Sequence, residues 1–243
     1  MQKYKKNSDY SYALGTEPTL QLLTDHPERV RNVYIHSRQN DNEICRRIEK
    51  LAADSRIEVI RSDRIFNILS DKENCYIMAL FDKYQADIRP EENHVVLVNP
   101  ANTGNLGTII RTSIGFGIRD IAIISPGVDI FDPRTIRASM GAFFQLRFQY
   151  FDSFADYLEH ADDRPIFPFM LDGARQLDEI QIPEKYSLVF GNEARGLDPV
   201  YQTYGQSVLI RHYPVIDSLN LCNAVSIALY EFTRGSVGKD FEY

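Results

Sequence analysis

The sequence predicts an α/β protein in which a C-terminal doubly wound parallel sheet follows a smaller N-terminal α/β unit. In the C-terminal part, continuous apolar runs alternate with helical patterns, as is typical of parallel strands covered on both faces. In the first part, shorter strand and helix patterns alternate over about 80 residues. The polar stretch DKYQADIRPEENH separates the two regions. We therefore expect an N-terminal domain at 1–85, a linker at 86–94 and a second domain at 95–243.

The N-terminal domain is expected to begin with a short helix, EPTLQLLTD, and a strand, VRNVYIH. In DNEICRRIEKLAADS, Ile44, Ile48 and Leu51 are spaced i, i+4 and i+7, which predicts an amphipathic helix. The strand RIEVIR, the helix SDRIFNILSD and the strand CYIMALFD complete the domain.

Five apolar runs are the expected strands of the C-terminal sheet: VVLVNP, DIAIIS, IFPFMLD, YSLVFG and SVLIRH. Helices are expected at 106–115, 133–144, 153–160 and 219–234. Gly115 and Gly117 stand where glycine commonly ends a helix, and Ser218 is placed to cap the last one.

The charge pattern leaves a nucleic-acid partner open. The net charge of −7 argues against a general attraction to nucleic acid. The excess lies in the C-terminal part, because residues 1–88 hold 14 basic and 14 acidic residues, whereas residues 89–243 hold 13 and 20. A local basic patch is enough for RNA binding. The candidate clusters are Lys3-Lys5-Lys6, Arg29-Arg31, Arg46-Arg47-Lys50 and Arg61-Arg64.

The three cysteines, Cys45, Cys75 and Cys222, have neither the spacing of a zinc site nor the number of a disulfide framework. We expect all three to be buried thiols and expect no metal. No window approaches the roughly 18 apolar residues of a membrane span, and no signal peptide is recognisable at the start. A cytoplasmic protein with no membrane partner is expected.

The stretch NPANTGNLGTIIRTSIGFG resembles a nucleotide cradle but lacks both nucleotide motifs. Gly104 and Gly107 are spaced G-x-x-G without a following lysine, which excludes a phosphate loop and a dinucleotide fingerprint. Arg111 lies about 140° from Leu106 around the helix, off its apolar stripe. This arginine is either solvated or directed at a phosphate. The glycines would let RNA approach the backbone closely.

Two further polar loops follow apolar runs. LVFGNEARGLDP leads from a strand into Gly191, which would allow a ligand close to the backbone. IRHYPVIDSLNLCNA leads into the last helix, where Asn220 and Asn223 share a face. Capping by Ser218 does not explain two asparagines in a first helical turn.

Together, N-x-G-x-x-x-R (Asn105, Gly107, Arg111), G-N-E-x-x-G-L (191–197) and S-L-N (218–220) resemble the SpoU/TrmH family. Its members are S-adenosylmethionine-dependent RNA ribose 2′-O-methyltransferases of the SPOUT class. The resemblance covers roughly residues 94–236, and residues 1–85 resemble the small RNA-binding domain that many members carry. It implies a deep trefoil knot in the C-terminal domain, an exception to the rule against threaded loops. It also implies a homodimer.

The resemblance further implies the site residues. The methyl donor would be held at Gly191, Ile210, Leu219 and Leu171. The catalytic group would be Arg111, Asn105, Glu193, Asn220 and Ser218. Because a guanidinium cannot be deprotonated in proteins, we expect Arg111 to bind a phosphate and stabilise developing alkoxide, not to act as a literal base. Asn105 and Glu193 would position Arg111 and the nucleotide.

The chain departs from the family pattern at two places. Cys222 stands where a serine is common, and IRHYP replaces the frequent I-P-M, which places Arg211 near the donor pocket. The expected function is methyl transfer to structured RNA, with ribosomal RNA slightly favoured over transfer RNA and no DNA partner. The alternative is a non-catalytic RNA-binding or assembly factor with the same fold. A nucleotide-dependent oxidoreductase is disfavoured by the missing glycine fingerprint.

Overall fold

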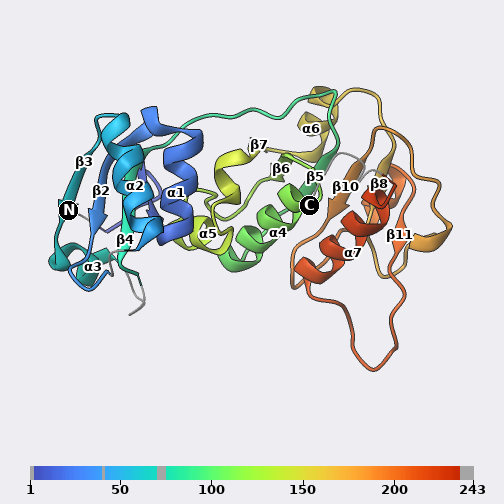
Figure 1. Ribbon diagram of the computed structural model, residues 1–243. Helices are drawn as coiled ribbons and strands as arrows, with labels where there is room; N and C mark the ends of the chain where they lie inside the picture. The colour runs from blue at the N-terminus through green and yellow to red at the C-terminus, as the bar shows by residue number, and fades with distance from the viewer. Residues whose placement is uncertain (1–2, 40–41, 70–74, 236–243) are drawn as a thin grey trace. The chain divides into compact units, whose positions relative to one another are not determined.

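A computed structural model of the chain describes residues 3–39, 42–69 and 75–235, and Figure 1 shows its helices and strands. The chain divides into two compact units, each assembled from separate segments. The first unit takes in Met1–Tyr84, Leu106–Arg111 and Asp129–Gln145. The second takes in Gln85–Asn105, Thr112–Val128 and Leu146–Tyr243.

A four-stranded sheet forms the centre of the first unit. Its strands lie in the order β1 (Tyr10–Leu14), β4 (Ile77–Asp82), β2 (Val30–Ile35) and β3 (Glu58–Arg61). β2 and β3 are parallel, whereas β4 is antiparallel to both of its neighbours. The connecting helices are α1 (Thr16–Asp25), η1 (Pro27–Arg29), α2 (Glu43–Asp54) and α3 (Asp63–Leu69). All six elements predicted for this part are present.

Strand β1 was not predicted from the sequence. Its segment YSYAL carries Ser11 among aromatic residues and forms neither an apolar run nor a turn-bounded alternation. Ser11 is nevertheless fully buried, and its Oγ donates a hydrogen bond of 2.5 Å to the carbonyl of Phe131. The buried hydroxyl is thus satisfied by a residue 120 positions away in the sequence, which is why a polar residue can stand in this strand.

The helix expected at 133–144 is interrupted. α5 (Pro133–Ala138) and the 3₁₀ helix η2 (Ala142–Gln145) are separated by Met140 and Gly141, which have φ of 53° and 92°. Two residues in the left-handed region cannot continue a right-handed helix. A side chain at Gly141 would also come within 2.9 Å of Cβ of Gln21 in α1. The segment packs with the first unit, although the sequence groups it with the C-terminal domain.

A five-stranded parallel sheet forms the centre of the second unit. Its strands lie in the order β7 (Arg147–Phe151), β6 (Asp120–Ile124), β5 (His94–Val98), β10 (Ser187–Phe190) and β8 (Ile166–Pro168). The strands alternate with α4 (Thr103–Gly115), α6 (Phe154–His160), η3 (Leu177–Glu179), η4 (Pro199–Thr203) and α7 (Leu221–Thr233). The predicted α/β class with a parallel sheet is confirmed. None of the helices in the described ranges is long and apolar enough to cross a membrane.

The strand membership of this sheet differs from the prediction at two places. β7 was not predicted because the polar residues Arg147 and Gln149 interrupt its apolar side chains, so it forms no continuous apolar run. The run SVLIRH was expected to join the sheet, but only Val208–Leu209 is extended, as β11. β11 pairs in parallel with β9 (Arg175–Gln176) in a separate two-stranded sheet.

The order of the strands places a topological switch between β5 and β10. From β5 the chain proceeds outward to β6 and β7, and then forms β8 and β10 on the other side of β5. In open parallel sheets, ligands bind beyond the carboxyl ends of the strands at such a point. The loops that follow β5 and β10 therefore mark the place where a functional site is expected.

Residues 86–94, predicted to be a linker, pack against the second unit. Ile88 is 3% exposed and belongs to the core of the parallel sheet, together with Val96 and Tyr157. The amide of Arg89 donates to Oδ1 of Asp120 at 2.9 Å, and Ala86 forms a bridge with Phe148. A polar composition therefore did not make this segment independent of the core.

Candidate functional site

Glu193 is the polar centre of the loops at the switch point. Its carboxylate accepts hydrogen bonds from the backbone amides of Ala101 and Asn102 at 3.0 and 3.1 Å. It also accepts one from Nδ2 of Asn105 at 3.2 Å. Amide donors are stronger partners for an ionised carboxylate than for a neutral group. This half-buried side chain thus ties the loop after β10 to the loop after β5 and to the start of α4.

Asn192 makes a second connection between the two loops, a role that its sequence motif did not predict. Its Nδ2 donates to the carbonyl of Asn99 at 2.8 Å, and its Oδ1 accepts from the amide of Ala194 at 3.0 Å. Asn99 has a φ of 53°, in the left-handed region that asparagine tolerates better than most residues. The dense asparagines of NPANTGN and GNE are the signal that predicts such side-chain turns.

Gly107 and Gly191 are required by the packing of the chain itself, and Gly196 by its backbone conformation. A side chain at Gly191 would overlap the backbone of Gly196 and Leu197, and Gly196 has a φ of 69°. A side chain at Gly107 would lie 2.5 Å from Cβ of Ala138 and from the carbonyl of Thr135. The prediction that Gly107 leaves room for RNA is therefore wrong, because α5 occupies that space.

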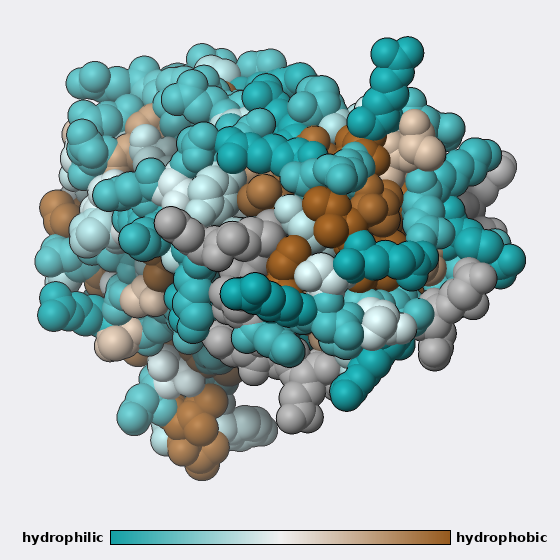
Figure 2. Space-filling view, turned by 90° about the vertical axis from the view of Figure 1, so that its left-hand side faces the viewer, coloured by the Kyte–Doolittle hydropathy of each residue, from teal (hydrophilic) through white to brown (hydrophobic). Residues whose placement is uncertain are grey.

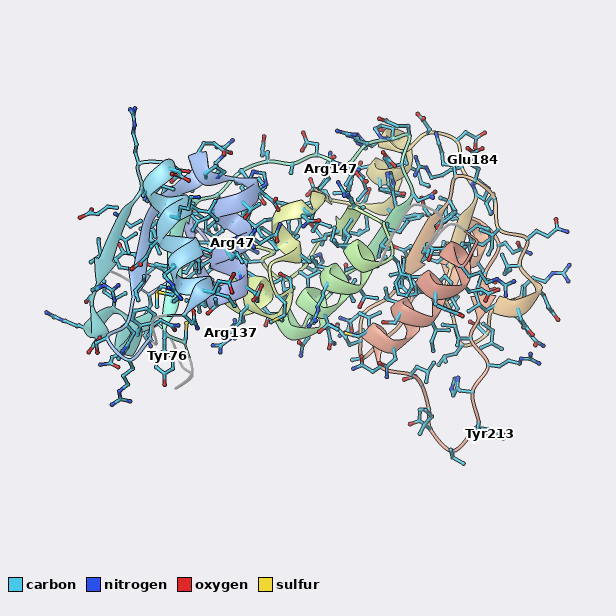
Figure 3. The ribbon with its side chains drawn as sticks, viewed as in Figure 1. Arg47, Tyr76, Arg137, Arg147, Glu184 and Tyr213 are labelled. Carbon is cyan, nitrogen blue, oxygen red and sulfur yellow. The ribbon has the colours of Figure 1, made fainter. Side chains whose placement is uncertain are left out.

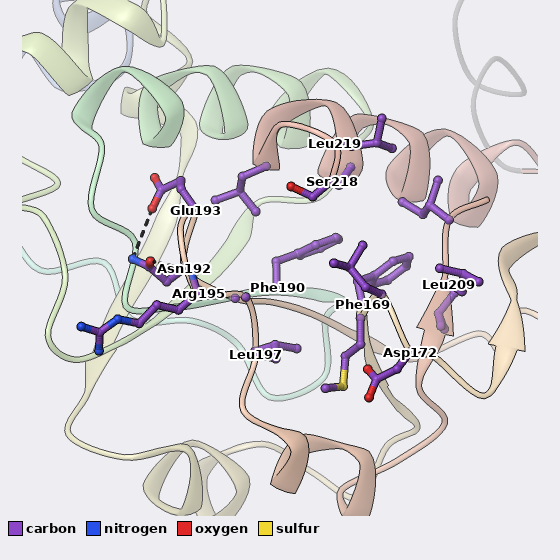
Figure 4. A pocket seen from close by; sticks show the side chains of 18 of the residues that line it. Phe169, Asp172, Phe190, Asn192, Glu193, Arg195, Leu197, Leu209, Ser218 and Leu219 are labelled. Atoms are coloured by element: carbon purple, nitrogen blue, oxygen red, sulfur yellow. Dashed lines mark hydrogen bonds between the residues drawn. The ribbon is translucent and has the colours of Figure 1, made fainter. Parts of the chain in front are cut away.

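A pocket of about 340 Å³ lies beside the loop after β10, and Figure 4 shows the side chains around it. Its polar lining includes Glu193, Ser218 and Asp172. The rings of Phe169 and Phe190 stack in its wall, with centroids 4.6 Å apart. All four residues predicted to contact the donor line this pocket: Gly191, Ile210, Leu219 and Leu171. Residues from three separate segments thus meet around one cavity.

The start of α7 corrects one prediction and explains one asparagine. Asn220, not Ser218, caps the helix, since its Oδ1 accepts from the amide of Cys222 at 2.8 Å. Ser218 lies two residues earlier and lines the pocket. Asparagine is among the best N-cap residues, so Asn220 has a structural role whatever else it does.

Cys222 differs from the other cysteines. Cys45 and Cys75 are buried, as predicted, but Cys222 is half-buried, so the prediction of three buried thiols is wrong for it. Its Sγ lies 3.5 Å from both the carbonyl oxygen and Oδ1 of Asn105. The residue that departs from the family pattern therefore contacts a predicted catalytic residue.

Arg111 is exposed, and its guanidinium makes no ion pair or side-chain hydrogen bond with any residue that the structure describes. Leu106, Ile109 and Ile110 of the same helix are buried, which confirms the predicted apolar stripe. The arginine is thus available to a ligand, as a cation directed at a phosphate must be.

Arg211 does not line the pocket, although its neighbours Ile210 and His212 do. Its guanidinium pairs with the carboxylate of Asp178 at 2.6 Å, and both side chains are more than 60% exposed. Arg211 is therefore near the pocket, as predicted, but its charge is directed to a surface carboxylate.

In two of the predicted basic clusters of the first unit, an arginine forms ion pairs with acidic neighbours. Arg31 pairs with Asp9 and Asp82, and Arg61 pairs with Glu49. On α2, Arg46, Arg47 and Lys50 are exposed, and Figure 3 shows Arg47 among the sticks of this unit.

The face drawn in Figure 2 is covered mostly by hydrophilic side chains. In the described ranges, no three His, Cys, Asp or Glu side chains gather as a metal site requires.

Comparison with known proteins gives one family model. Residues 92–230 match the model of the SpoU rRNA Methylase family. An uncharacterized tRNA/rRNA methyltransferase of Synechocystis sp. is 32% identical over 143 residues, which are 58% of this chain and 52% of that protein. The 23S rRNA (adenosine(1067)-2′-O)-methyltransferase of Streptomyces laurentii is 31% identical over 160 residues, 63% of this chain and 59% of that protein. The chain thus spans little more than half the length of these curated relatives.

Solved structures share the fold over nearly the whole chain. The SpoU methyltransferase AviRb of Streptomyces viridochromogenes aligns with a TM-score of 0.79 at 21% identity, covering 93% of this chain and 89% of that one. An AdoMet-bound rRNA methyltransferase of Sinorhizobium meliloti aligns with a TM-score of 0.77 at 24% identity, covering 94% and 88%. The α/β fold with a parallel sheet is therefore shared with methyltransferase structures of this kind.

Proposed function

The chain belongs to the SpoU rRNA Methylase family, and we propose that it transfers a methyl group from S-adenosylmethionine to a ribose 2′-hydroxyl of structured RNA. The observation that carries this proposal is the pocket beside Glu193. Four residues proposed as donor contacts, from three separate segments, line this one cavity. The names of the relatives support the reaction type, since those from Streptomyces laurentii and Bacillus subtilis are 23S rRNA 2′-O-methyltransferases.

The pocket fits a methyl donor of this kind. Its volume of about 340 Å³ is within the range of small-ligand sites. Stacked Phe169 and Phe190 give it an apolar wall, while Asp172 and Ser218 offer polar contacts. When bound, S-adenosylmethionine supplies an electrophilic methyl carbon on a positively charged sulfur. The residues of the chain then have to orient the ribose oxygen and assist removal of its proton.

Arg111 is the proposed electrostatic catalyst. Its guanidinium is exposed and has no carboxylate partner among the described residues, so a phosphate of the RNA can occupy its donor fork. The same cation would stabilise negative charge developing on the 2′-oxygen. The adjacent phosphate, or water, takes the proton, because arginine itself stays protonated.

Asn105 and Glu193 are proposed to position the nucleotide. Nδ2 of Asn105 donates one hydrogen bond to Glu193, and the two backbone amides of the β5 loop hold the same carboxylate. Nδ2 of Asn192 is a fourth donor to this carboxylate at 3.5 Å, and a side chain held by four donors is suited to a fixed orientation. Ser218 and Asn220 would complete the edge of the site on the side of α7.

We also infer that the C-terminal domain is knotted as a deep trefoil. Support comes from the close passage of backbone segments in the region of the pocket. Side chains at Gly173 and Gly205 would overlap the backbone at Val208 and at Ile166, respectively. Only glycine permits segments to cross at such short separation.

The N-terminal domain, residues 1–85, is proposed to bind the RNA substrate. Residues 95–243 would form the catalytic domain, and residues 86–94 would join the two domains. The exposed cations of α2, Arg46, Arg47 and Lys50, are the candidates for phosphate contacts. Ribosomal RNA is favoured, because several curated relatives act on 23S rRNA. A cytoplasmic location stays a prediction.

The protein is proposed to act as a homodimer. Tyr213 and Val215 are 83% and 85% exposed in the loop that joins β11 to α7, and Figure 3 shows Tyr213 on this loop. Ile227 and Tyr230 on α7 are 40% and 62% exposed. Exposed large apolar side chains in adjacent segments are typical of an association surface.

The decisive test is mass-spectrometric mapping of ribose methylation in RNA from cells with and without the gene. We expect one 2′-O-methyl group to be lost, and purified protein with S-adenosylmethionine should restore it. The competing function is that of an RNA-binding assembly factor without catalysis. Unchanged methylation, together with no heat of S-adenosylmethionine binding in calorimetry, would establish that alternative.

A further inference from the structure

The thiol of Cys222 lies at a junction of the polar network. It is carried by the first turn of α7, where Oδ1 of Asn220 fixes the amide of Cys222 at 2.8 Å. From there its Sγ reaches the carbonyl and Oδ1 of Asn105, both at 3.5 Å. The side chain is half-buried, so the contact is partly shielded from water.

The two polar neighbours of Asn105 together define how its amide is turned. Oδ1 faces the thiol, a weak donor, and Nδ2 faces Oε1 of Glu193 at 3.2 Å. The reversed amide would set its oxygen against the carboxylate, which loses that hydrogen bond, and would turn its NH₂ toward the sulfur, which is only a weak acceptor. Nδ2 carries two hydrogens, and Glu193 takes one of them. The second is therefore left to donate to a ligand.

We propose that Cys222 is a positioning residue for Asn105: its thiol holds the amide with Oδ1 turned toward α7, so that the second N–H of Nδ2 is presented to the RNA. The inference rests on the proposed methyl transfer, in which Asn105 orients the nucleotide. It assigns a role to the position at which this chain departs from the family pattern. Asn105 then acts as a hydrogen-bond donor, not as an acceptor.

Three variants test the role. Cys222→Ala removes the donor and should lower kcat by about threefold to tenfold, the range expected for one hydrogen bond. The KM for S-adenosylmethionine and its Kd in calorimetry should not change. Cys222→Ser keeps a donor and should restore at least half of the lost rate. Ser226→Ala is the matched control, because among the described residues the Ser226 hydroxyl donates to the carbonyl of Cys222 within α7, at 2.7 Å.

A double-mutant cycle separates positioning through Asn105 from a direct contact of the thiol with RNA. In the background of Asn105→Ala, adding Cys222→Ala should cause no further loss of kcat, because the two residues act as one unit. Additive losses would overturn the inference. So would equal rates of wild type and Cys222→Ala.

A readout without turnover keeps this inference distinguishable from the proposed function. The side-chain amide resonances of Asn105, identified by their absence in Asn105→Ala, should shift in Cys222→Ala and stay in place in Ser226→Ala. Resonances that do not move in Cys222→Ala would refute the positioning role even if the enzyme is active. If the wild type transfers no methyl group to any RNA but the resonances shift, the proposed function fails and the contact remains.

Discussion

At the scale of single residues, Arg111 and Glu193 differ in how far the described residues satisfy their charges. Arg111 has no ion pair with any described residue, whereas Glu193 accepts three hydrogen bonds from the β5 loop and α4. A satisfied carboxylate is fixed in place, and an unpaired guanidinium is free to meet an anion. This difference fits the proposed roles, which are positioning for Glu193 and charge stabilisation for Arg111.

The role of Arg111 predicts the effect of a charge-conserving substitution. Arg111→Lys keeps the positive charge but loses the planar fork that binds phosphate in two places. We expect methyl transfer to fall by about 100-fold, as when one preorganised donor is removed from an active site. Calorimetry should give an unchanged Kd for S-adenosylmethionine. Near-normal turnover by Arg111→Lys would exclude this role.

At the scale of elements, the contact between α4 and α5 explains Gly107, which was expected to leave room for RNA. Gly107 lies where a side chain would meet Cβ of Ala138 and the carbonyl of Thr135 at 2.5 Å. The carbonyl belongs to the backbone, so neither helix can yield by a side-chain rotation alone. The first motif therefore combines a catalytic candidate with a packing requirement on the same helix.

This packing predicts different outcomes for two glycines of α4. Gly107→Ala should lower the free energy of unfolding by about 1–3 kcal/mol, because the added methyl group overpacks the helix contact. Gly115→Ala is the matched control: its added methyl group would meet nothing within 4 Å. Alanine there should be neutral or stabilise by up to about 1 kcal/mol, since it favours the helix. Urea denaturation of both variants measures the difference, and equal stabilities would contradict it.

At the scale of the whole molecule, a buried polar network stabilises the parallel sheet at the amino-terminal ends of its strands. His94 is fully buried; its ring nitrogens contact the hydroxyl of Tyr157 and the carbonyl of Arg89, each at 2.8 Å. Tyr157 in turn contacts Oγ of Ser187 at 2.5 Å. Burial lowers the pKa of His94 to about 4, so the ring is neutral near pH 7.

The pKa of His94 predicts a loss of stability in acid. The unfolded chain binds a proton below the ordinary pKa of about 6.5, whereas the folded chain does so only near 4. The contribution is therefore complete above pH 6.5 and is lost as the pH falls toward 4, by roughly 3 kcal/mol. His94→Gln, which keeps one donor and one acceptor, should flatten this part of the profile in urea unfolding. An unchanged pH dependence in the variant would assign the loss to other groups.

The proposed dimer predicts a change of mass on substitution in the β11–α7 loop. Replacing both Tyr213 and Val215 by Asp should shift the protein from dimer to monomer in light scattering, because charge opposes burial of this surface. Val200→Asp is the control, since Val200 is 47% exposed but lies in η4, outside the proposed surface. A monomeric wild type, or a double variant that remains dimeric, would reject the proposed surface.

Much of the fold could be predicted from sequence because apolar periodicity is local. All six expected elements of the N-terminal part and four of the five expected C-terminal sheet strands are present. The errors have a common cause. Ser11 in β1, the polar positions of β7 and the break at Met140–Gly141 depend on partners distant in the sequence or on an edge position. No local pattern records such partners.

The sequence by itself determined the α/β class, the family and the identity of the proposed site residues, because these depend on local spacing and on motif order. Only the tertiary structure decided that Asn220 caps α7, that Gly107 is filled by α5, and that Cys222 touches Asn105. Each of these depends on distances between backbone segments that are far apart in the chain. Those distances follow from packing the whole sheet, which is why the contact of one half-buried thiol with a proposed site residue could be recognised only in three dimensions.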